Sequence, residues 1–412
     1  MQAVLPFRHL YPAFAAGYLL SYFYRNVNAV ISPELTREFS LSPGALGLLT
    51  SAYFMAFTAM QIPAGMLLDR YGPRRVEPAL LLVAAAGALL FALAESEGGL
   101  LAARTLLGLG SAVGLMAPLK AISTWCRPEE RASMGGWIMV AGAVGALVAT
   151  TPLELALRVV SWRTIFVALS VMSCAAAFFI WRRVPDTAST STRGAGLGAQ
   201  WAGVRSVFSH RRFWWIAPLA GFGAGSFMAV QGLWSVPWLI EVNGYSRAVA
   251  AQHLLAMGVA MLAGYFVLGM YSTRLARRGA HPCHLFAAGF AINAAVLAAI
   301  LADVPGSWLW WPVYGLGATV NVLAFNVLNE GFEVGLAGRA NTALNLVMIG
   351  GSFAMQWGIG LVVDAARATL GLDLAGGLKL AFAVALALYA LAFGWFARGW
   401  REHSGAARAV PA

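Results

Sequence analysis

Between two long apolar runs lies the charged turn GMLLDRYGPRR, at residues 65–75. The flanking runs, at 45–68 and 76–96, are each long enough to cross a bilayer, which takes about 20 apolar residues. The one aspartate and three arginines of the turn are charges that a bilayer core excludes. The turn therefore predicts a helix hairpin in a membrane, with its charged end in water.

The whole chain has the composition of a membrane protein. Of its 412 residues, 60% are hydrophobic and 11% are charged, whereas a soluble domain has about 45–50% apolar and about 25% charged residues. A soluble globule is thus excluded, and the length allows roughly twelve spans of about 20 residues with their loops. The net charge of +11 is scattered between apolar runs, so it predicts no continuous face for nucleic acid.

Apolar windows bounded by charge, proline and glycine predict twelve transmembrane helices. Their ranges are 10–31, 45–68, 76–96, 99–123, 132–156, 163–183, 213–239, 248–272, 283–303, 307–329, 341–364 and 376–398. A polar interval rich in Ser, Thr, Gly and Arg follows the sixth helix and cannot bury a core. We therefore expect an all-α integral membrane protein with two six-helix bundles, residues 1–183 and 212–412, joined by a linker at 184–211.

Positive charge alternates from loop to loop along the predicted helices. Both termini and every second loop together hold 19 of the 28 Lys and Arg residues, whereas the other loops hold five. Cytoplasmic loops are the ones enriched in Lys and Arg. We therefore expect a multi-pass protein of the inner or plasma membrane with both termini and the linker in the cytoplasm.

A constant offset of 204 residues relates the two halves. Seven identities share it, among them Gly65 with Gly269 and Arg70 with Arg274. Six helices per half make the repeat parallel, and transporters with such repeats bind substrate near the membrane midplane where the repeats meet. The repeat therefore predicts a secondary transporter with pseudo-symmetric bundles.

The 65–75 turn resembles the G-x-L-x-D-R-x-G-R-R signature of the major facilitator superfamily. Arg104 on a glycine-patterned fourth helix and SWRTIF at 161–166 resemble further parts of that family, and the resemblance covers essentially the whole chain. It implies the family's twelve-helix fold and alternating access. It also implies that Asp69 latches onto the positive N-terminus of helix 11, near residues 339–342. The gating motif implied in this way is Gly65, Asp69, Arg70, Gly72, Arg74 and Arg75.

Gly142 and Gly145 lie on the fifth predicted helix. They lack the following proline of the superfamily's antiporter signature, which argues against drug/proton antiport. Small residues let helix backbones approach closely, so we expect these glycines at helix contacts between the two halves.

Three cations lie inside predicted spans, namely Arg25, Arg104 and Lys120, while no acid lies near the centre of any span. Ionisable side chains in a bilayer are costly and mark functional sites, so an unbalanced positive cavity favours an anionic substrate. Arg25 shares a helix stripe with Tyr22 and Asn28, an arrangement suited to a carboxylate or a phosphate. The alternative for Arg25 is snorkelling or pairing with backbone carbonyls.

The stretch SYFYRNVN, residues 21–28, also resembles the first helix of the organophosphate:phosphate antiporters, a branch of the superfamily in which an Arg there binds phosphate. Those antiporters add an Arg on helix 7, where this chain has Gln231 and Trp234. Phosphate, carboxylate and mixed aromatic anions therefore all stay open. For Arg104 the superfamily resemblance implies either proton transfer or structural hydrogen bonds to helix 1, and Lys120 either attracts the anion or snorkels.

Polar and aromatic residues of the second half complete the predicted substrate site. Each of these either lines the cavity or only joins helices, and Trp238 is expected in the interfacial belt. The full predicted set is Tyr22, Arg25, Asn28, Arg104, Lys120, Gln231, Trp234, Asn321 and Gln356.

The six histidines form no metal-ligand or nucleophile-base pattern, and no Gly-rich phosphate loop is present, so we expect neither enzyme activity nor a cofactor. The leading prediction is a monomeric secondary transporter for a small organic anion, by proton symport or anion exchange. The alternatives are an export carrier for drugs or siderophore-like amphiphiles, and a transporter-like membrane sensor. No residue is identified as the proton carrier.

Overall fold

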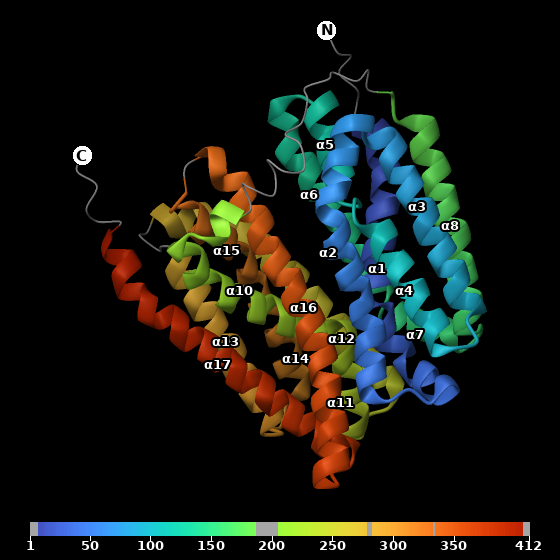
Figure 1. The fold of residues 1–412 in the computed structure, drawn as a ribbon, viewed down its shortest axis with the longest axis vertical. Coiled ribbons are helices and arrows are strands. Elements are labelled where there is room, and N and C mark those ends of the chain that lie inside the picture. Colours follow the sequence, from blue (N-terminus) through green and yellow to red (C-terminus); the bar gives the residue numbers. More distant parts are fainter. Residues whose placement is uncertain (1–6, 187–204, 278–281, 333, 407–412) are drawn as a thin grey trace. The chain divides into compact units, whose positions relative to one another are not determined.

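A computed structural model describes residues 7–186, 205–277, 282–332 and 334–406 (Figure 1). All regular elements in these ranges are helices. The chain divides into two compact units. Unit 1 takes in Met1–Gly194, Ser235–Pro237 and Ser246–Gln252, and unit 2 takes in Ala195–Trp234, Trp238–Tyr245 and His253–Ala412.

Unit 1 contains the first eight helices. They are α1 (Phe7–Phe39), α2 (Pro43–Tyr71), α3 (Pro73–Leu93), α4 (Glu97–Ser111), α5 (Met116–Trp125), α6 (Pro128–Val148), α7 (Thr151–Leu157) and α8 (Trp162–Arg183). Figure 1 shows α3 and α8 side by side, and extensive contacts join them. Between them Phe91 stacks on Phe166 with 4.2 Å between ring centroids.

Prolines explain why two predicted spans are each split into two helices. Pro118 and Pro152 have no N–H to donate to the carbonyls four residues earlier, and their rings crowd those carbonyls. The helix is accordingly interrupted between α4 and α5 and between α6 and α7, where the axis bends by 42°.

Side-chain caps and one glycine define the turns. Ser42, Ser96 and Ser161 precede α2, α4 and α8, and each side-chain oxygen accepts a 3.2 Å hydrogen bond from the backbone N–H three residues later. Such caps satisfy backbone donors that a helix start leaves open. Gly72 joins α2 to α3 with φ of +73°, a conformation that glycine adopts without a steric penalty.

Gly142 and Gly145 bring α6 against α1 inside unit 1. A Cβ on Gly145 would lie 2.2 Å from the Leu19 carbonyl oxygen, and one on Gly142 would lie 2.6 Å from the Tyr18 ring. The expectation that they mediate contacts between the halves is therefore wrong. The face of α6 that carries both glycines is turned toward α1, where the missing side chains let the two helices approach.

The remaining elements continue the chain. They are α10 (Arg211–Ala229), the π-helix η1 (Val230–Trp234), α11 (Ser235–Glu241), α12 (Arg247–Arg277), α13 (Pro282–Leu301), α14 (Ser307–Gly317), the 3-10 helix η2 (Ala318–Val322), α15 (Leu323–Asn329), α16 (Val334–Leu370) and α17 (Leu374–Ala406). In the core of unit 2, α10 packs on α16 and α17. There Trp215 stacks on Phe396 at 4.9 Å and donates a 2.7 Å hydrogen bond to its backbone oxygen.

Ten helical segments of the described chain are long and apolar enough to cross a membrane, or eleven if the bent pair α6 and α7 forms one span. Helix α1 covers the first predicted span but is not among the ten, and it carries Arg25, Glu34 and Arg37. The predicted class, an all-helical membrane protein, is confirmed.

Candidate functional site

Arg25 of α1 lies half-buried against aromatic rings. Its guanidinium carbon is 4.7 Å from the ring centroid of Tyr22, 5.3 Å from that of Phe57 and 5.9 Å from that of Phe54. The Arg25 Nε is buried without a hydrogen-bond partner. Aromatic faces attract a cation through their quadrupole but carry no net charge. The positive charge of Arg25 is therefore held in place without being neutralised.

Arg104 of α4 approaches a neighbouring ring, that of Tyr53, and is fully buried. Its Nη1 donates a 2.8 Å hydrogen bond to the backbone oxygen of Tyr24, while its Nε and Nη2 have no partner. Its guanidinium carbon lies 5.2 Å from the ring centroid of Tyr53, which stacks on Phe57. Of the two roles open for Arg104, the hydrogen bond to helix 1 is thus present.

Tyr53, Phe54 and Phe57 form what we call the α2 aromatic cluster, and both arginines contact it. Among the described residues, no Asp or Glu oxygen lies within 4.0 Å of either guanidinium. Buried charges are normally paired, because leaving water is costly. The cluster therefore holds two cations that an anion would complement.

The other first-helix candidates differ in their surroundings. Tyr22 is partly exposed and packs edge-on against Tyr18 at 5.0 Å. Asn28 is fully buried, and its Nδ2 donates a 2.9 Å hydrogen bond to the Thr50 hydroxyl of α2. The structure therefore brings Tyr22 to Arg25, whereas the Asn28 amide nitrogen is bonded to α2 and its oxygen is buried without a partner.

Lys120 belongs to a different group of residues. Its Nζ lies 2.8 Å from Oδ1 of Asp69, and both side chains are about half exposed, at 44% and 46%. Asp69 is the acid of the predicted gating motif, so the structure joins two residues that the sequence assigns to separate sites. The Lys120 charge is paired here and is not part of the group around Arg25.

The last two arginines of the motif contact the end of α8 and the segment that follows it. Arg75 forms a 2.6 Å ion pair with Asp186, and Arg74 donates a 3.1 Å hydrogen bond to the Trp181 backbone oxygen. Arg70 lies over the ring of the following tyrosine at 5.1 Å, and a Cβ on Gly65 would meet nothing within 4 Å. The α2–α3 turn is thereby fastened to the residues that follow the sixth predicted span.

The second-half candidates lie in unit 2. Trp234 is buried and donates a 2.9 Å hydrogen bond from Nε1 to the Gln356 backbone oxygen, while both polar atoms of the Gln356 side chain are buried without a partner. Asn321 donates a 2.8 Å hydrogen bond to the Ala318 backbone oxygen. Gln231 is partly exposed on η1. Trp234 and Gln356 therefore meet, through a bond that joins helices.

Trp238 is fully buried and lies 4.4 Å from the Phe382 ring of α17. The expectation that it belongs to the interfacial belt is wrong, because the indole is enclosed by protein and not exposed at the surface.

Sequence reasoning missed the α2 aromatic cluster and Glu77. The spacing of Tyr53 and Phe57, four residues apart, places both on one helix face. The chain has 49 aromatic residues, 46 of them outside this three-residue cluster. The spacing alone therefore does not identify a site. Glu77 lies two residues after the charged 65–75 turn. A hydropathy window centred on Glu77 also contains charges of the turn, so the sequence does not single out Glu77 as an acid inside a span.

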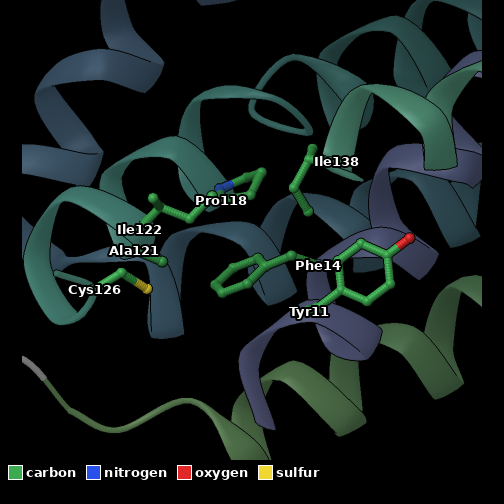
Figure 2. A pocket seen from close by; sticks show the side chains of 7 residues that line it. All are labelled: Tyr11, Phe14, Pro118, Ala121, Ile122, Cys126 and Ile138. Atoms are coloured by element: carbon green, nitrogen blue, oxygen red, sulfur yellow. The ribbon is translucent and has the colours of Figure 1, made fainter. Parts of the chain in front are cut away.

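An apolar pocket in unit 1 is separate from these groups (Figure 2). Residues of α1, α5 and α6 line it, together with Cys126 at the end of α5: Tyr11, Phe14, Pro118, Ala121, Ile122, Cys126 and Ile138. The lining carries no Lys, Arg, Asp or Glu, so it lacks the charge that would hold an anion.

Residues 14–355 match the model of the Major Facilitator Superfamily. This match covers most of the chain, and the chain belongs to the major facilitator superfamily, a family of membrane transporters rather than enzymes. The superfamily predicted from the 65–75 turn is confirmed.

Three curated relatives are similar over part of the chain. The hexuronate transporter of Escherichia coli (strain K12) is 29% identical over 245 residues, which are 56% of this chain and 56% of that protein. The galacturonate transporter of Dickeya chrysanthemi is 27% identical over 245 residues, 56% of this chain and 71% of that protein. The probable sulfoacetate transporter of Cupriavidus necator is 24% identical over 273 residues, 63% and 64% of the two chains. The chain thus spans little more than half the length of the first of these relatives.

Solved structures share the fold over nearly the whole chain. A bacterial homolog to the human lysosomal transporter Spinster superposes with a TM-score of 0.77 at 19% identity, over 95% of this chain and 96% of that chain. A D-xylose-proton symporter gives a TM-score of 0.74 at 14% identity, over 94% and 97%. At these identities the likeness establishes the major facilitator fold alone.

Proposed function

We propose that this protein is a secondary active transporter for a small organic anion of the sugar-acid class. The observation that carries the proposal is the pair Arg25 and Arg104, which contact one aromatic cluster without a carboxylate partner among the described residues. An anion supplies the missing negative charge, whereas a cation or a neutral amphiphile does not.

Arg25 is the residue that binds the anionic group in this proposal. It is the more accessible of the two arginines, and its planar fork can donate two parallel hydrogen bonds to a carboxylate. Tyr22 and Phe57, whose rings already flank the guanidinium, offer apolar faces to the carbon skeleton of the substrate. Arg104 holds the α1 backbone beside Arg25 and adds positive potential.

The relatives' names support the anion class and narrow it. Hexuronate, galacturonate and sulfoacetate are carboxylate or sulfonate anions. This favours a carboxylate over the phosphate that the first-helix resemblance left open. It also speaks against an exporter of lipophilic drugs, for which an unpaired arginine would be a costly lining group.

The remaining features of the proposal follow the superfamily. Transport proceeds by alternating access in the inner or plasma membrane, with both termini cytoplasmic and the chain acting as a monomer. A proton or solute gradient supplies the energy. The motif that contains Asp69 and Arg75 controls the rate of the conformational change, and it does not bind substrate.

Counterflow in proteoliposomes tests the proposal. Vesicles loaded with unlabelled galacturonate should accumulate labelled galacturonate, and Arg25→Gln should abolish this. Arg183→Gln is the matched control, because Arg183 also lies over an aromatic ring, that of Phe179 at 4.9 Å, but at the end of α8. If Arg25→Gln exchanges galacturonate at the wild-type rate, Arg25 is not the binding residue. If the wild type exchanges neither galacturonate nor glucuronate, the sugar-acid proposal fails.

A further inference from the structure

Helix α3 carries an acid that the proposed binding group does not use. Glu77 lies one turn inside α3, and its relative exposure is 1%. Both of its carboxylate oxygens are buried without a hydrogen-bond partner. Of the acids whose side chains the structure describes, Glu154 is also buried, but it is held by two 3.1 Å hydrogen bonds from Arg158.

The Glu77 carboxyl occupies space that α1 leaves open. A Cβ built on Gly17 would lie 2.6 Å from Oε1 of Glu77 and 3.5 Å from a methyl group of Leu81. Any larger residue at position 17 would displace the carboxyl group. On this side the acid is therefore enclosed by the Gly17 backbone and the Leu81 side chain, neither of which offers it a hydrogen bond.

Four cations on α3 and on neighbouring helices make their hydrogen bonds or ion pairs with groups other than Glu77. Arg74 and Arg75 contact the end of α8, Lys120 pairs with Asp69, and Arg104 donates to α1. Further titratable groups with described side chains on α1, α2, α4 and α8 are Tyr11, Tyr18, Tyr22, Tyr24, Arg25, Glu34, Arg37, Glu38, Tyr53, Arg70, Tyr71, Glu97, Arg163, Cys174, Arg182 and Arg183. None of these groups is within hydrogen-bond distance of Glu77.

An ionised carboxylate that is buried without a hydrogen-bond partner loses its hydration, and no protein group replaces the lost hydrogen bonds. Burying an unpaired charge is so unfavourable that the group takes up a proton instead. Acids buried at membrane depth are rare and mark ion pathways and proton relays. Glu77 is a buried acid near the start of α3, a helix long and apolar enough to cross a membrane, and it has no hydrogen-bond partner among the described residues.

We propose that Glu77 is protonated in this conformation and binds the proton that is transported with the anion. This inference rests on the proposed function and adds its coupling ion. The proton is taken from water on one side, forms an O–H bond with a Glu77 oxygen, and returns to water on the other side when the carboxyl group is hydrated. Gly17 shapes the cavity that excludes water from Glu77 while the proton is bound.

Two transport assays separate this inference from the proposed function. Glu77→Gln, an uncharged variant of the same shape, should keep galacturonate counterflow at equal pH and lose galacturonate accumulation driven by an inward proton gradient. Glu154→Gln, the matched buried acid, should keep both. Gradient-driven accumulation by Glu77→Gln at the wild-type level would overturn the inference. A wild type with counterflow but no response to the proton gradient overturns the inference alone, and a wild type without counterflow overturns the proposed function.

A measurement without substrate tests the protonation directly. Infrared spectra of the purified protein at neutral pH should show the carbonyl band of a protonated carboxylic acid, shifted in heavy water and missing from Glu77→Gln. The band should remain in Glu154→Gln. If the spectra of the wild type and Glu77→Gln do not differ in this region, Glu77 is ionised and the inference is wrong.

Discussion

The Nη1 atom of Arg104 donates a 2.8 Å hydrogen bond to the backbone oxygen of Tyr24, the residue that precedes Arg25. The Tyr24 hydroxyl lies 2.8 Å from the Ser173 hydroxyl of α8. Helix α1 is therefore held by both α4 and α8 at the position of the arginine that we propose binds the anion. A rigid backbone at this point keeps the Arg25 guanidinium oriented before substrate arrives.

Arg104→Lys should lower both the stability of the protein and its affinity for the anion. Lysine keeps the charge but lacks the planar fork that reaches the Tyr24 oxygen, and loss of a buried hydrogen bond to a charged group costs about 1–3 kcal/mol. Thermal unfolding and galacturonate titration of the purified variant measure the two effects. Arg183→Lys at the end of α8 is the control and should change neither. An Arg104→Lys protein with wild-type melting temperature and affinity would show that the Tyr24 bond has no such role.

Asp69→Asn should slow transport while leaving the affinity for the anion within a few fold. The Asp69–Lys120 pair is half exposed, so removing it should change stability by less than about 1 kcal/mol. Because the two residues form one contact, Lys120→Gln should slow transport as well, and the double variant should be no slower than Asp69→Asn alone. Counterflow rates and galacturonate titrations of all three proteins provide the comparison. An affinity loss as large as that of Arg25→Gln would place Asp69 in substrate binding instead of gating.

Gly145→Ala should be strongly destabilising. Its Cβ would lie 2.2 Å from the Leu19 carbonyl oxygen, and forcing backbones apart in a packed interior costs about 1–3 kcal/mol or more. Gly136→Ala on the same helix α6 has no atom within 4 Å of the new Cβ and should be neutral or slightly stabilising, because alanine favours the helix. Melting temperatures in one detergent compare the pair. Equal melting temperatures would contradict the close approach of α6 to α1.

The spans could be predicted because a bilayer permits few solutions. Every backbone polar group must be satisfied inside the lipid, so a long apolar run can only be a helix. The ends of the helices could not be predicted in the same way. Helix α16, Val334–Leu370, extends beyond the predicted 341–364 at both ends, because a helix can continue into water while hydropathy reports only its apolar part.

Of the candidate site, only the charged residues could be predicted from the sequence. Arg25 and Arg104 stand out in apolar sequence, whereas Tyr53 and Phe57 resemble the many other aromatic residues of membrane helices. The Lys120 side chain on α5 reaches Asp69 on α2, a contact between two helices that residue spacing cannot give. Glu154 pairs with Arg158 four residues later on the same helix, a spacing that the sequence shows. Glu77 has Arg74 three residues earlier, but that arginine bonds to Trp181 instead, and only the structure shows that the Glu77 carboxyl group has no hydrogen-bond partner.

The measurement that tests the central claim most directly is ligand-induced thermal stabilisation with two sugars that differ in one group. Galactose carries a hydroxymethyl group where galacturonate carries a carboxylate, and a ligand that binds the folded state raises its melting temperature. We predict that galacturonate stabilises the wild type, that galactose does not, and that neither stabilises Arg25→Gln. Equal stabilisation of the wild type by both sugars, or full stabilisation of Arg25→Gln by galacturonate, would contradict an anion site at Arg25.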